Sequence, residues 1–300
     1  MTDVFDRIEE IAGVAARQNE MLSHHTTFGV GGPCDLMIWV STGEALLEVL
    51  AVARSESLPT FVLGKGSNVL VRDGGLDGLV IRLVDELAQI EVAGSRIRAG
   101  GGASLGEVVS RATSAGIGGL EFLAGIPGTV GGAATANAGG KDVWFGHRVE
   151  EVTVVRDDLS RVSLSPQEIG FGYRTSGIRP GWVVTEAVLA GRETTIDEAR
   201  HEVETYLARR KSTQPVNERS AGCIFRNPTR DSAGCLIEQA GLKGLRVGGA
   251  EVSDIHANFI VNAGGATARE ILELASEVRR RVKDTSGVAL EYEISIVGKE

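Results

Sequence analysis

The chain has 300 residues, a formal net charge of −9, and 42% hydrophobic and 24% charged residues, which is ordinary globular composition with length for two or three domains. The acidic balance argues against nucleic-acid binding, which needs a basic face, and no apolar run reaches the roughly 18 residues of a membrane span. The polar start is unlike a signal peptide, and three cysteines without a CxxC pair are typical of reduced thiols. We therefore expect a cytoplasmic protein that binds neither nucleic acid nor membrane.

Hydrophobic periodicity predicts helices and strands in mixed order along the chain. In residues 1–84 we expect a helix at 3–18, a strand at 35–40, a helix at 42–55, and strands at 61–63, 69–71 and 79–83. In residues 85–195 we expect strands at 90–92 and 96–99, a helix at 104–115, and strands at 149–156, 160–164 and 182–189. In residues 196–300 we expect helices at 196–210, 232–240 and 267–285, and strands at 246–252, 258–262 and 289–297. The order favours an α+β fold with three domains, 1–84, 85–195 and 196–300, over one doubly wound sheet.

Two glycine-rich segments are candidates for phosphate binding. Residues 120–140 carry no charge after Glu121, and glycines let a ligand approach backbone amides closely. Residues 64–68, G-K-G-S-N, follow an apolar strand but match neither the Walker loop nor the G-x-G-x-x-G fingerprint. Alone, the second segment could be a tight turn; together the two predict the sides of a dinucleotide cleft. The candidate cofactor residues are Gly64, Lys65, Gly66, Ser67, Asn68, Pro127, Gly128, Thr129, Gly131, Gly132 and Asn137.

Two basic motifs have both a structural and a functional interpretation. Arg174, in G-Y-R-T-S at 172–176, is either a salt-bridged turn residue or a cation that stabilises developing negative charge. The basic residues 209–211, R-R-K, suit a helix C-terminus, or they bind substrate phosphates.

The remaining candidates are a thiol and carboxylates. Cys223 follows a glycine and is either a small buried hydrophobe or a proton donor. Glu291 and Glu293 flank Tyr292 on the expected last strand. Either both are exposed at a sheet edge, or one is buried and takes part in the chemistry, because burying a carboxylate is otherwise costly. His24 and His25 are adjacent and lack supporting ligands, so we expect no metal site.

Taken together, the motifs resemble the MurB family of UDP-N-acetylenolpyruvoylglucosamine reductases over roughly residues 20–298. The matching pieces stand in family order, which makes the set far more specific than any one of them. They are T-T-F-G-V-G-G-P at 26–33, L-G-K-G-S-N at 63–68, L-A-G-I-P-G-T-V-G-G at 123–132, G-Y-R-T-S at 172–176, S-A-G-C-I-F-R-N-P at 220–228 and L-E-Y-E-I-S-I-V-G at 290–298.

The resemblance implies two α+β subdomains that hold FAD in the manner of the vanillyl-alcohol-oxidase superfamily (PCMH-type), and a third domain for a UDP-sugar. It implies that NADPH reduces FAD and that hydride then reaches the enolpyruvyl double bond, which yields UDP-N-acetylmuramate for peptidoglycan synthesis. The remaining possibilities are another FAD-dependent oxidoreductase or oxidase on this fold, and a non-catalytic nucleotide-sugar or flavin-binding module.

The resemblance also assigns site residues. The family's catalytic arginine and glutamate fall on Arg174 and Glu293, and its proton donor, a serine in many members, falls on Cys223. The substrate-binding candidates are Tyr173, Arg210 and Asn227. A strand follows Arg174 too soon for the substrate-capping tyrosine insertion of one subtype, so the chain looks like the shorter, type II-like subtype. We expect a monomer.

Overall fold

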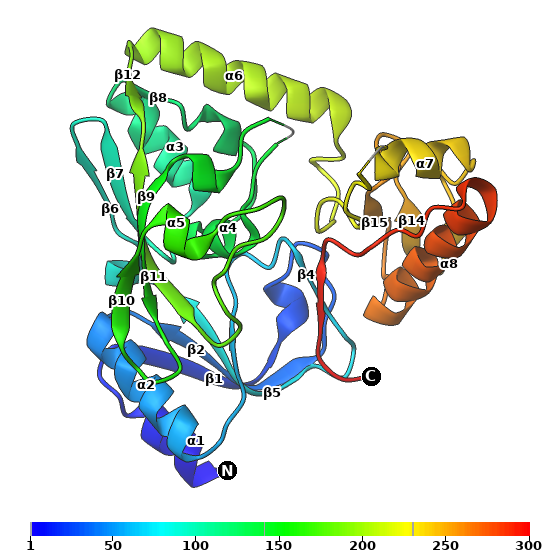
Figure 1. The fold of residues 1–300 in the computed structure, drawn as a ribbon. Coiled ribbons are helices and arrows are strands. Elements are labelled where there is room, and N and C mark those ends of the chain that lie inside the picture. The colour runs from blue at the N-terminus through cyan, green and yellow to red at the C-terminus, as the bar shows by residue number, and fades with distance from the viewer. Residues whose placement is uncertain (1, 141, 230) are drawn as a thin grey trace. The chain divides into compact units, whose positions relative to one another are not determined.

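The computed structural model describes residues 2–140, 142–229 and 231–300. The chain forms two compact units, each assembled from three segments (Figure 1). Unit 1 contains Met1–Gln18, Leu36–Gly64 and Gly78–Ala208, and unit 2 contains Asn19–Asp35, Lys65–Asp77 and Arg209–Glu300. The chain therefore leaves and re-enters each unit, and the three-domain division stays a prediction.

The first sheet has four strands in the order β1 (Val14–Met21), β2 (Pro33–Val40), β5 (Leu76–Leu83) and β3 (Thr60–Val62). Helices α1 (Thr2–Glu9) and α2 (Gly43–Ser55) share its core, in which Ile8, Leu46 and Ile38 are fully buried. A short 3₁₀ turn, η1 (Leu22–His24), lies between β1 and β2.

The helix expected at 3–18 is wrong beyond Glu9. Residues 10–13 form a turn in which Gly13 has a left-handed φ of +85°, and β1 begins at Val14. Val14 and Ala16 pack against the core with strand spacing. Tertiary packing thus overrode the apparent helical period.

The second sheet lies in unit 1 and is wholly antiparallel. Its order is β10 (Arg161–Leu164), β9 (Val149–Val155), β11 (Val183–Ala190), β7 (Arg96–Gly100) and β6 (Ile90–Ala93). The strands expected at 90–92 and 96–99 are confirmed, and they pair as a hairpin across Gly94 and Ser95. The same unit holds the β8–β12 pair (Ile117–Gly118, Arg192–Glu193), helices α3 (Leu105–Ser114), α4 (Val130–Ala136) and α5 (Pro166–Ile169), and 3₁₀ turns η2 (Asp85–Ala88), η3 (Glu121–Leu123) and η4 (Phe145–His147). Helix α6 (Ile196–Thr213) belongs to unit 1 as far as Ala208, and its last turn belongs to unit 2.

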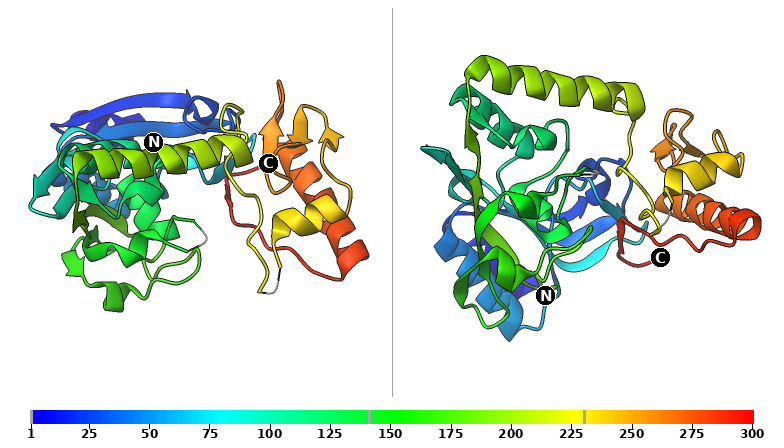
Figure 2. Two further views of the ribbon diagram at one scale, coloured as in Figure 1. Left: turned by 90° about the horizontal axis from the view of Figure 1, so that it is seen from above. Right: turned by 45° about the horizontal axis from the view of Figure 1, so that its top comes forward.

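Helix α6 is the long yellow-green helix in both views of Figure 2, and residues between 196 and 207 neighbour α3. Val109 of α3 and Val203 of α6 line one shallow hollow between the helices. Within the described ranges, no helix combines the length and apolarity that crossing a bilayer requires.

Unit 2 surrounds a separate core. It contains α7 (Ala233–Gln239), the sheet β13 (Arg246–Val247), β14 (Ala250–Val252) and β15 (Ile260–Asn262), and α8 (Ala268–Ser286). Strand β16 (Ser295–Val297) pairs in parallel with β4 (Val69–Val71). Thr267 caps α8 and forms a capping box with Glu270, which adds hydrogen bonds to the helix's first turn.

The last expected strand, 289–297, is shorter than predicted. Only Ser295–Val297 forms regular strand, while Tyr292 makes one isolated bridge to Phe225. Residues 224–226 bend and share their hydrogen bonds between two neighbours, so no regular ladder extends over residues 290–294. The strand expected at 246–252 is likewise two strands, separated by Gly248 with a φ of +54°.

Candidate active site and cofactor cradle

The segment 120–140 folds into η3, a loop and the short helix α4. Thr129 is the N-cap of α4, and its hydroxyl accepts a hydrogen bond from the Gly132 amide at 3.3 Å. The amides of Val130 and Gly131 donate to the carbonyls of Ala103 and Gly101 at 2.9 and 2.8 Å. These amides are already hydrogen-bonded within the protein. Gly131 and Gly132 therefore let a ligand approach the backbone closely, but their N–H groups already have partners within the protein.

Within unit 1 the two glycine-rich segments meet at Gly64. A Cβ on Gly64 would lie 2.6 Å from the Thr129 hydroxyl oxygen, which is closer than atoms tolerate. The Arg82 guanidinium donates to the Gly64 carbonyl at 2.9 Å and holds the backbone at this position. The meeting of residue 64 with the 120–140 segment agrees with the expected pairing of the two.

The rest of the G-K-G-S-N segment belongs to unit 2. Gly66 has a φ of +62°, and a Cβ there would lie 2.3 Å from the His25 carbonyl oxygen, so glycine is required. The Asn68 side chain donates to the Glu293 carbonyl at 3.4 Å, and its carbonyl accepts from Ser295 at 2.9 Å. Asn68, predicted to bind cofactor, is therefore a neighbour of the predicted catalytic glutamate.

Tyr173 and Arg174 form the tip of a tight turn in unit 1. Gly172 and Thr175 exchange backbone hydrogen bonds of 3.0 and 3.2 Å across it. Arg174 has a φ of +53°, a left-handed conformation that costs a residue with a Cβ about 1–2 kcal/mol. Such strain persists where the surroundings over-determine it, often at functional sites.

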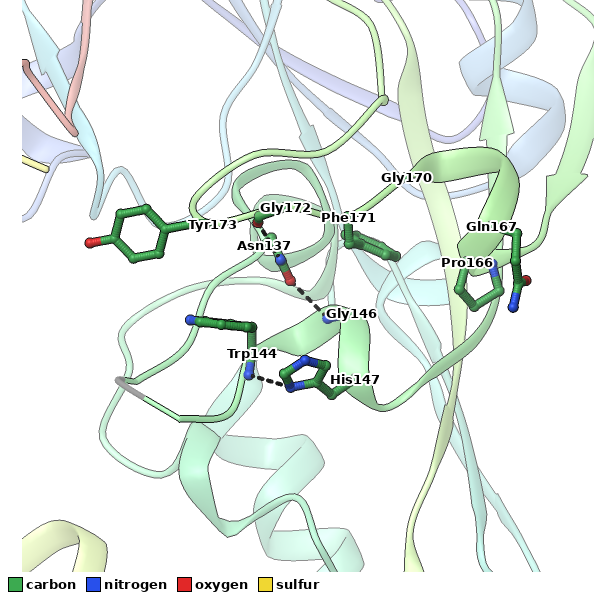
Figure 3. A pocket seen from close by; sticks show the side chains of 10 residues that line it. All are labelled: Asn137, Trp144, Gly146, His147, Pro166, Gln167, Gly170, Phe171, Gly172 and Tyr173. Carbon is green, nitrogen blue, oxygen red and sulfur yellow. Dashed lines mark hydrogen bonds between the residues drawn. The ribbon is translucent and has the colours of Figure 1, made fainter. Parts of the chain in front are cut away.

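Asn137 holds that turn. Its amide nitrogen donates to the Gly172 carbonyl at 2.7 Å, and its oxygen accepts from the Gly146 amide at 2.8 Å (Figure 3). Asn137 is 2% exposed and is the left-handed C-cap of α4. Since both side-chain groups are engaged, Asn137 links α4 to the Tyr173–Arg174 turn, a role that sequence reasoning missed although Asn is typical of such caps.

A cavity of about 320 Å³ opens beside this turn. Trp144, Phe171 and Tyr173 line it, and the Trp144 and Tyr173 rings meet edge-on with centroids 6.4 Å apart (Figure 3). Tyr173 is 41% exposed, so its ring is accessible to a ligand.

In unit 2 the segments that carry Cys223 and Glu293 are hydrogen-bonded neighbours. The Glu293 amide donates to the Ile224 carbonyl at 2.8 Å, and the Arg226 amide donates to the Glu291 carbonyl at 2.9 Å. Phe225 stacks on Tyr292 with ring centroids 5.5 Å apart. The structure thus brings together two predicted catalytic segments that lie far apart in the sequence.

Asn227 and Arg210, two predicted substrate-binding residues, already have structural contacts in unit 2. The Asn227 side-chain oxygen accepts from the Ala233 amide at 3.0 Å, at the start of α7. Arg210 donates to the Gln214 side chain at 3.4 Å near the end of α6. Their substrate contacts stay predictions.

Comparison with known proteins gives this arrangement a context. Residues 34–164 match the model of an FAD binding domain, and residues 214–297 match that of the UDP-N-acetylenolpyruvoylglucosamine reductase C-terminal domain. UDP-N-acetylenolpyruvoylglucosamine reductase 2 of Symbiobacterium thermophilum is 45% identical over 283 residues, which cover 94% of this chain and 92% of that protein. The chain belongs to the UDP-N-acetylenolpyruvoylglucosamine reductase family.

Other members of the family agree over nearly the full length. The reductase of Bacillus subtilis is 36% identical over 301 residues, with 99% of each chain covered. The solved structure of UDP-N-acetylenolpyruvylglucosamine reductase from Thermus caldophilus superposes with a TM-score of 0.82 at 41% identity and covers 94% of this chain and 98% of that one. The predicted family and α+β fold are confirmed.

Family membership makes the chain an FAD-dependent oxidoreductase of peptidoglycan precursor synthesis that uses NADPH. The alternative of a different flavin oxidase is not favoured. The residues present fit FAD, because the exposed Gly132 places no side chain on the surface and the 120–140 segment carries no charge after Glu121. An uncharged, small-residue surface of this kind admits close backbone contact with a cofactor.

Proposed function

We propose that this chain reduces the enolpyruvyl group of UDP-N-acetylglucosamine enolpyruvate through Arg174, Cys223 and Glu293. The observation that carries the proposal is the hydrogen-bonded pairing of the Cys223 and Glu293 segments, with the Glu293 amide on the Ile224 carbonyl at 2.8 Å. Bound FAD supplies the hydride, which it has taken from NADPH. The protein's own residues stabilise the developing negative charge and donate the proton.

Arg174 is proposed to stabilise negative charge. Hydride addition to one carbon of the enol ether moves electron density toward the substrate carboxylate. The guanidinium group is always charged, and its planar fork matches a carboxylate. Preorganised charge of this kind lowers the barrier because it needs no rearrangement during the reaction. The fixed turn around Arg174 provides that preorganisation.

Cys223 is proposed to donate the proton to the other carbon of the double bond. A cysteine thiol has an ordinary pKa of about 8.5, so it is a stronger acid than the serine of many relatives. The S–H bond breaks, a C–H bond forms, and solvent returns a proton to the thiolate. Glu293 is proposed either to act in its protonated form, since an anionic carboxylate would repel the developing charge, or to orient Arg174 or a water molecule.

The finer assignments are proposals of the same kind. Tyr173, Arg210 and Asn227 contact the UDP-sugar, and residues 64–68 with 127–132 and Asn137 form or support the FAD site. The protein acts in the cytoplasm as a monomer, without nucleic acid or membrane partners. The short connection after Arg174 leaves closure over the substrate to segments other than a tyrosine insertion.

Substitution at Cys223 tests the proposal by separating the two halves of the reaction. Cys223→Ala should let NADPH reduce the flavin at the wild-type rate but should slow anaerobic reoxidation by the enolpyruvyl substrate by about 10²–10⁴-fold, because general acid catalysis is lost. Cys223→Ser should keep substantial activity. Stopped-flow flavin absorbance measures both steps.

The matched control is Cys235→Ala, which removes an exposed thiol from α7 in the same unit. It should leave both steps unchanged. Normal turnover by Cys223→Ala would show that the thiol is not the proton donor. Failure of the substrate to reoxidise wild-type flavin would overturn the proposed reaction itself.

A further inference from the structure

The segment that carries Cys223 has no regular strand to fix it in place. Residues 223 and 225 make only isolated bridges, to Phe259 on one side and to Tyr292 on the other. Ile224 donates its N–H to the Asn258 carbonyl at 2.8 Å, while its own carbonyl accepts from Glu293 at 2.8 Å. Ile224 therefore spans the gap between the 258–259 and 291–293 segments.

The side chain of Asn258 completes this arrangement. Its Oδ1 accepts from the Phe225 N–H at 3.0 Å, and its Nδ2 donates to the Phe225 carbonyl at 2.8 Å. The Asn258 side chain thereby makes the two hydrogen bonds to the Phe225 backbone that a neighbouring strand would otherwise make. With the main-chain bond to Ile224, it makes three hydrogen bonds to the two residues that follow Cys223.

Burial makes these bonds decisive. Asn258 is 3% exposed and Phe225 is 1% exposed, so water does not readily replace a lost partner, and an unpaired buried polar group is costly. Only an amide offers a donor and an acceptor in the required arrangement. An aspartate would place a second oxygen against the Phe225 carbonyl and repel it.

We propose that Asn258 is a positioning residue, which sets the register of the Cys223 segment against the Glu293 segment and so aims the proton donor. This inference rests on the proposed role of Cys223. Asn258 reaches the chemistry only through the backbone of Ile224 and Phe225. Displacing a catalytic group by about 1 Å can cost about 10²-fold in rate.

The test uses the FAD-loaded enzyme with Asn258→Asp, which keeps the size of the side chain. Reoxidation by the enolpyruvyl substrate should fall about 10–100-fold, with a larger solvent isotope effect in D₂O because proton delivery becomes limiting. Flavin content and reduction by NADPH should match the wild type. Asn258→Ser is the second variant, should the aspartate prevent folding.

Asn262→Asp is the matched control. Asn262 lies on β15 in the same unit, and its amide holds the Phe28 carbonyl at 3.0 Å and the Gly264 and Ala266 amides at 3.2 and 3.1 Å, none of them in the Cys223 segment. It should leave the reoxidation rate and the isotope effect unchanged. An equal loss of reoxidation rate in this control would show that Asn258 has only a general structural role, and it would overturn the inference.

A double variant asks whether Asn258 acts through Cys223. In a Cys223→Ala background, Asn258→Asp should lower the reoxidation rate little further, since residues that act as a unit are not additive. If the rate losses of the two single variants multiplied in the double variant, the positioning role would be refuted. A wild-type rate in folded Asn258→Asp would refute it as well. Because wild-type reoxidation is measured in parallel, failure of the proposed reaction is recognised separately.

Discussion

At several positions in this protein, the surrounding atoms decide the backbone conformation or the residue type, whatever the intrinsic preference of the residue. Arg174 occupies a left-handed turn position that favours glycine. Gly66 and Gly64 are required because backbone and hydroxyl atoms stand where a Cβ would be. Thus the left-handed backbone is satisfied by glycine at Gly66 and is strained at the proposed catalytic Arg174, whereas Gly64 is required by lack of space alone.

Replacing Arg174 with glycine should separate stability from activity. Relief of the left-handed backbone should leave the free energy of unfolding unchanged or raise it by up to about 1 kcal/mol, while reoxidation of the flavin by substrate should nearly cease. Chemical denaturation and stopped-flow absorbance measure the two effects.

Arg161→Gly is the control, because Arg161 is exposed in the regular strand β10. It should lower stability by about 0.5–1 kcal/mol and leave the rates unchanged. If Arg174→Gly were markedly less stable than the wild type, the backbone would not be strained there.

At the scale of elements, the turn between β14 and β15 is held by its own polar groups. The Asn258 amide donates to Nδ1 of His256 at 3.2 Å, and the Phe259 amide donates to the His256 carbonyl at 2.9 Å. Burial lowers the pKa of the His256 imidazole below its ordinary value. The accepting Nδ1 must also be unprotonated, so the neutral ring supports the turn.

This pKa shift predicts a pH dependence. A histidine whose folded pKa is depressed contributes stability above its unfolded pKa of about 6.5, and this is lost as the pH falls toward the folded value. Between pH 7.5 and 5, the wild type should therefore lose about 2–4 °C more in Tm than His256→Gln. Thermal denaturation followed by circular dichroism measures the difference.

His201→Gln, on an exposed face of α6, is the control and should follow the wild-type curve. Parallel curves for the wild type and His256→Gln would contradict the neutral buried state of His256.

At the scale of the whole molecule, each unit is built from distant parts of the chain. The core of unit 2 contains Phe28, Val30 and Leu70 as well as residues after Ala221. Strand β16 pairs with β4. The C-terminal region therefore lacks part of its core and a strand partner when it is separated from the rest.

Residues 209–300 alone should consequently fail to fold cooperatively. Loss of buried Phe28, Val30 and Leu70 removes large apolar side chains, each worth about 2–5 kcal/mol, against a total stability of about 5–15 kcal/mol. Circular dichroism melting and NMR dispersion of the fragment, with the full chain as control, measure this. A sharp cooperative transition in the fragment would contradict the prediction.

The sequence by itself determined what depends on neighbours in the chain. The helix expected at 267–285 and the strands expected at 90–92 and 96–99 are present as α8, β6 and β7, and the ordered motifs predicted the family. The tertiary structure alone decided that residues 14–21 form a strand, that Asn137 holds the Tyr173–Arg174 turn, and that Asn258 joins the Cys223 segment to that of Glu293. The physical reason is that these outcomes rest on buried hydrogen bonds and packing between residues far apart in the chain, which no local period or spacing records.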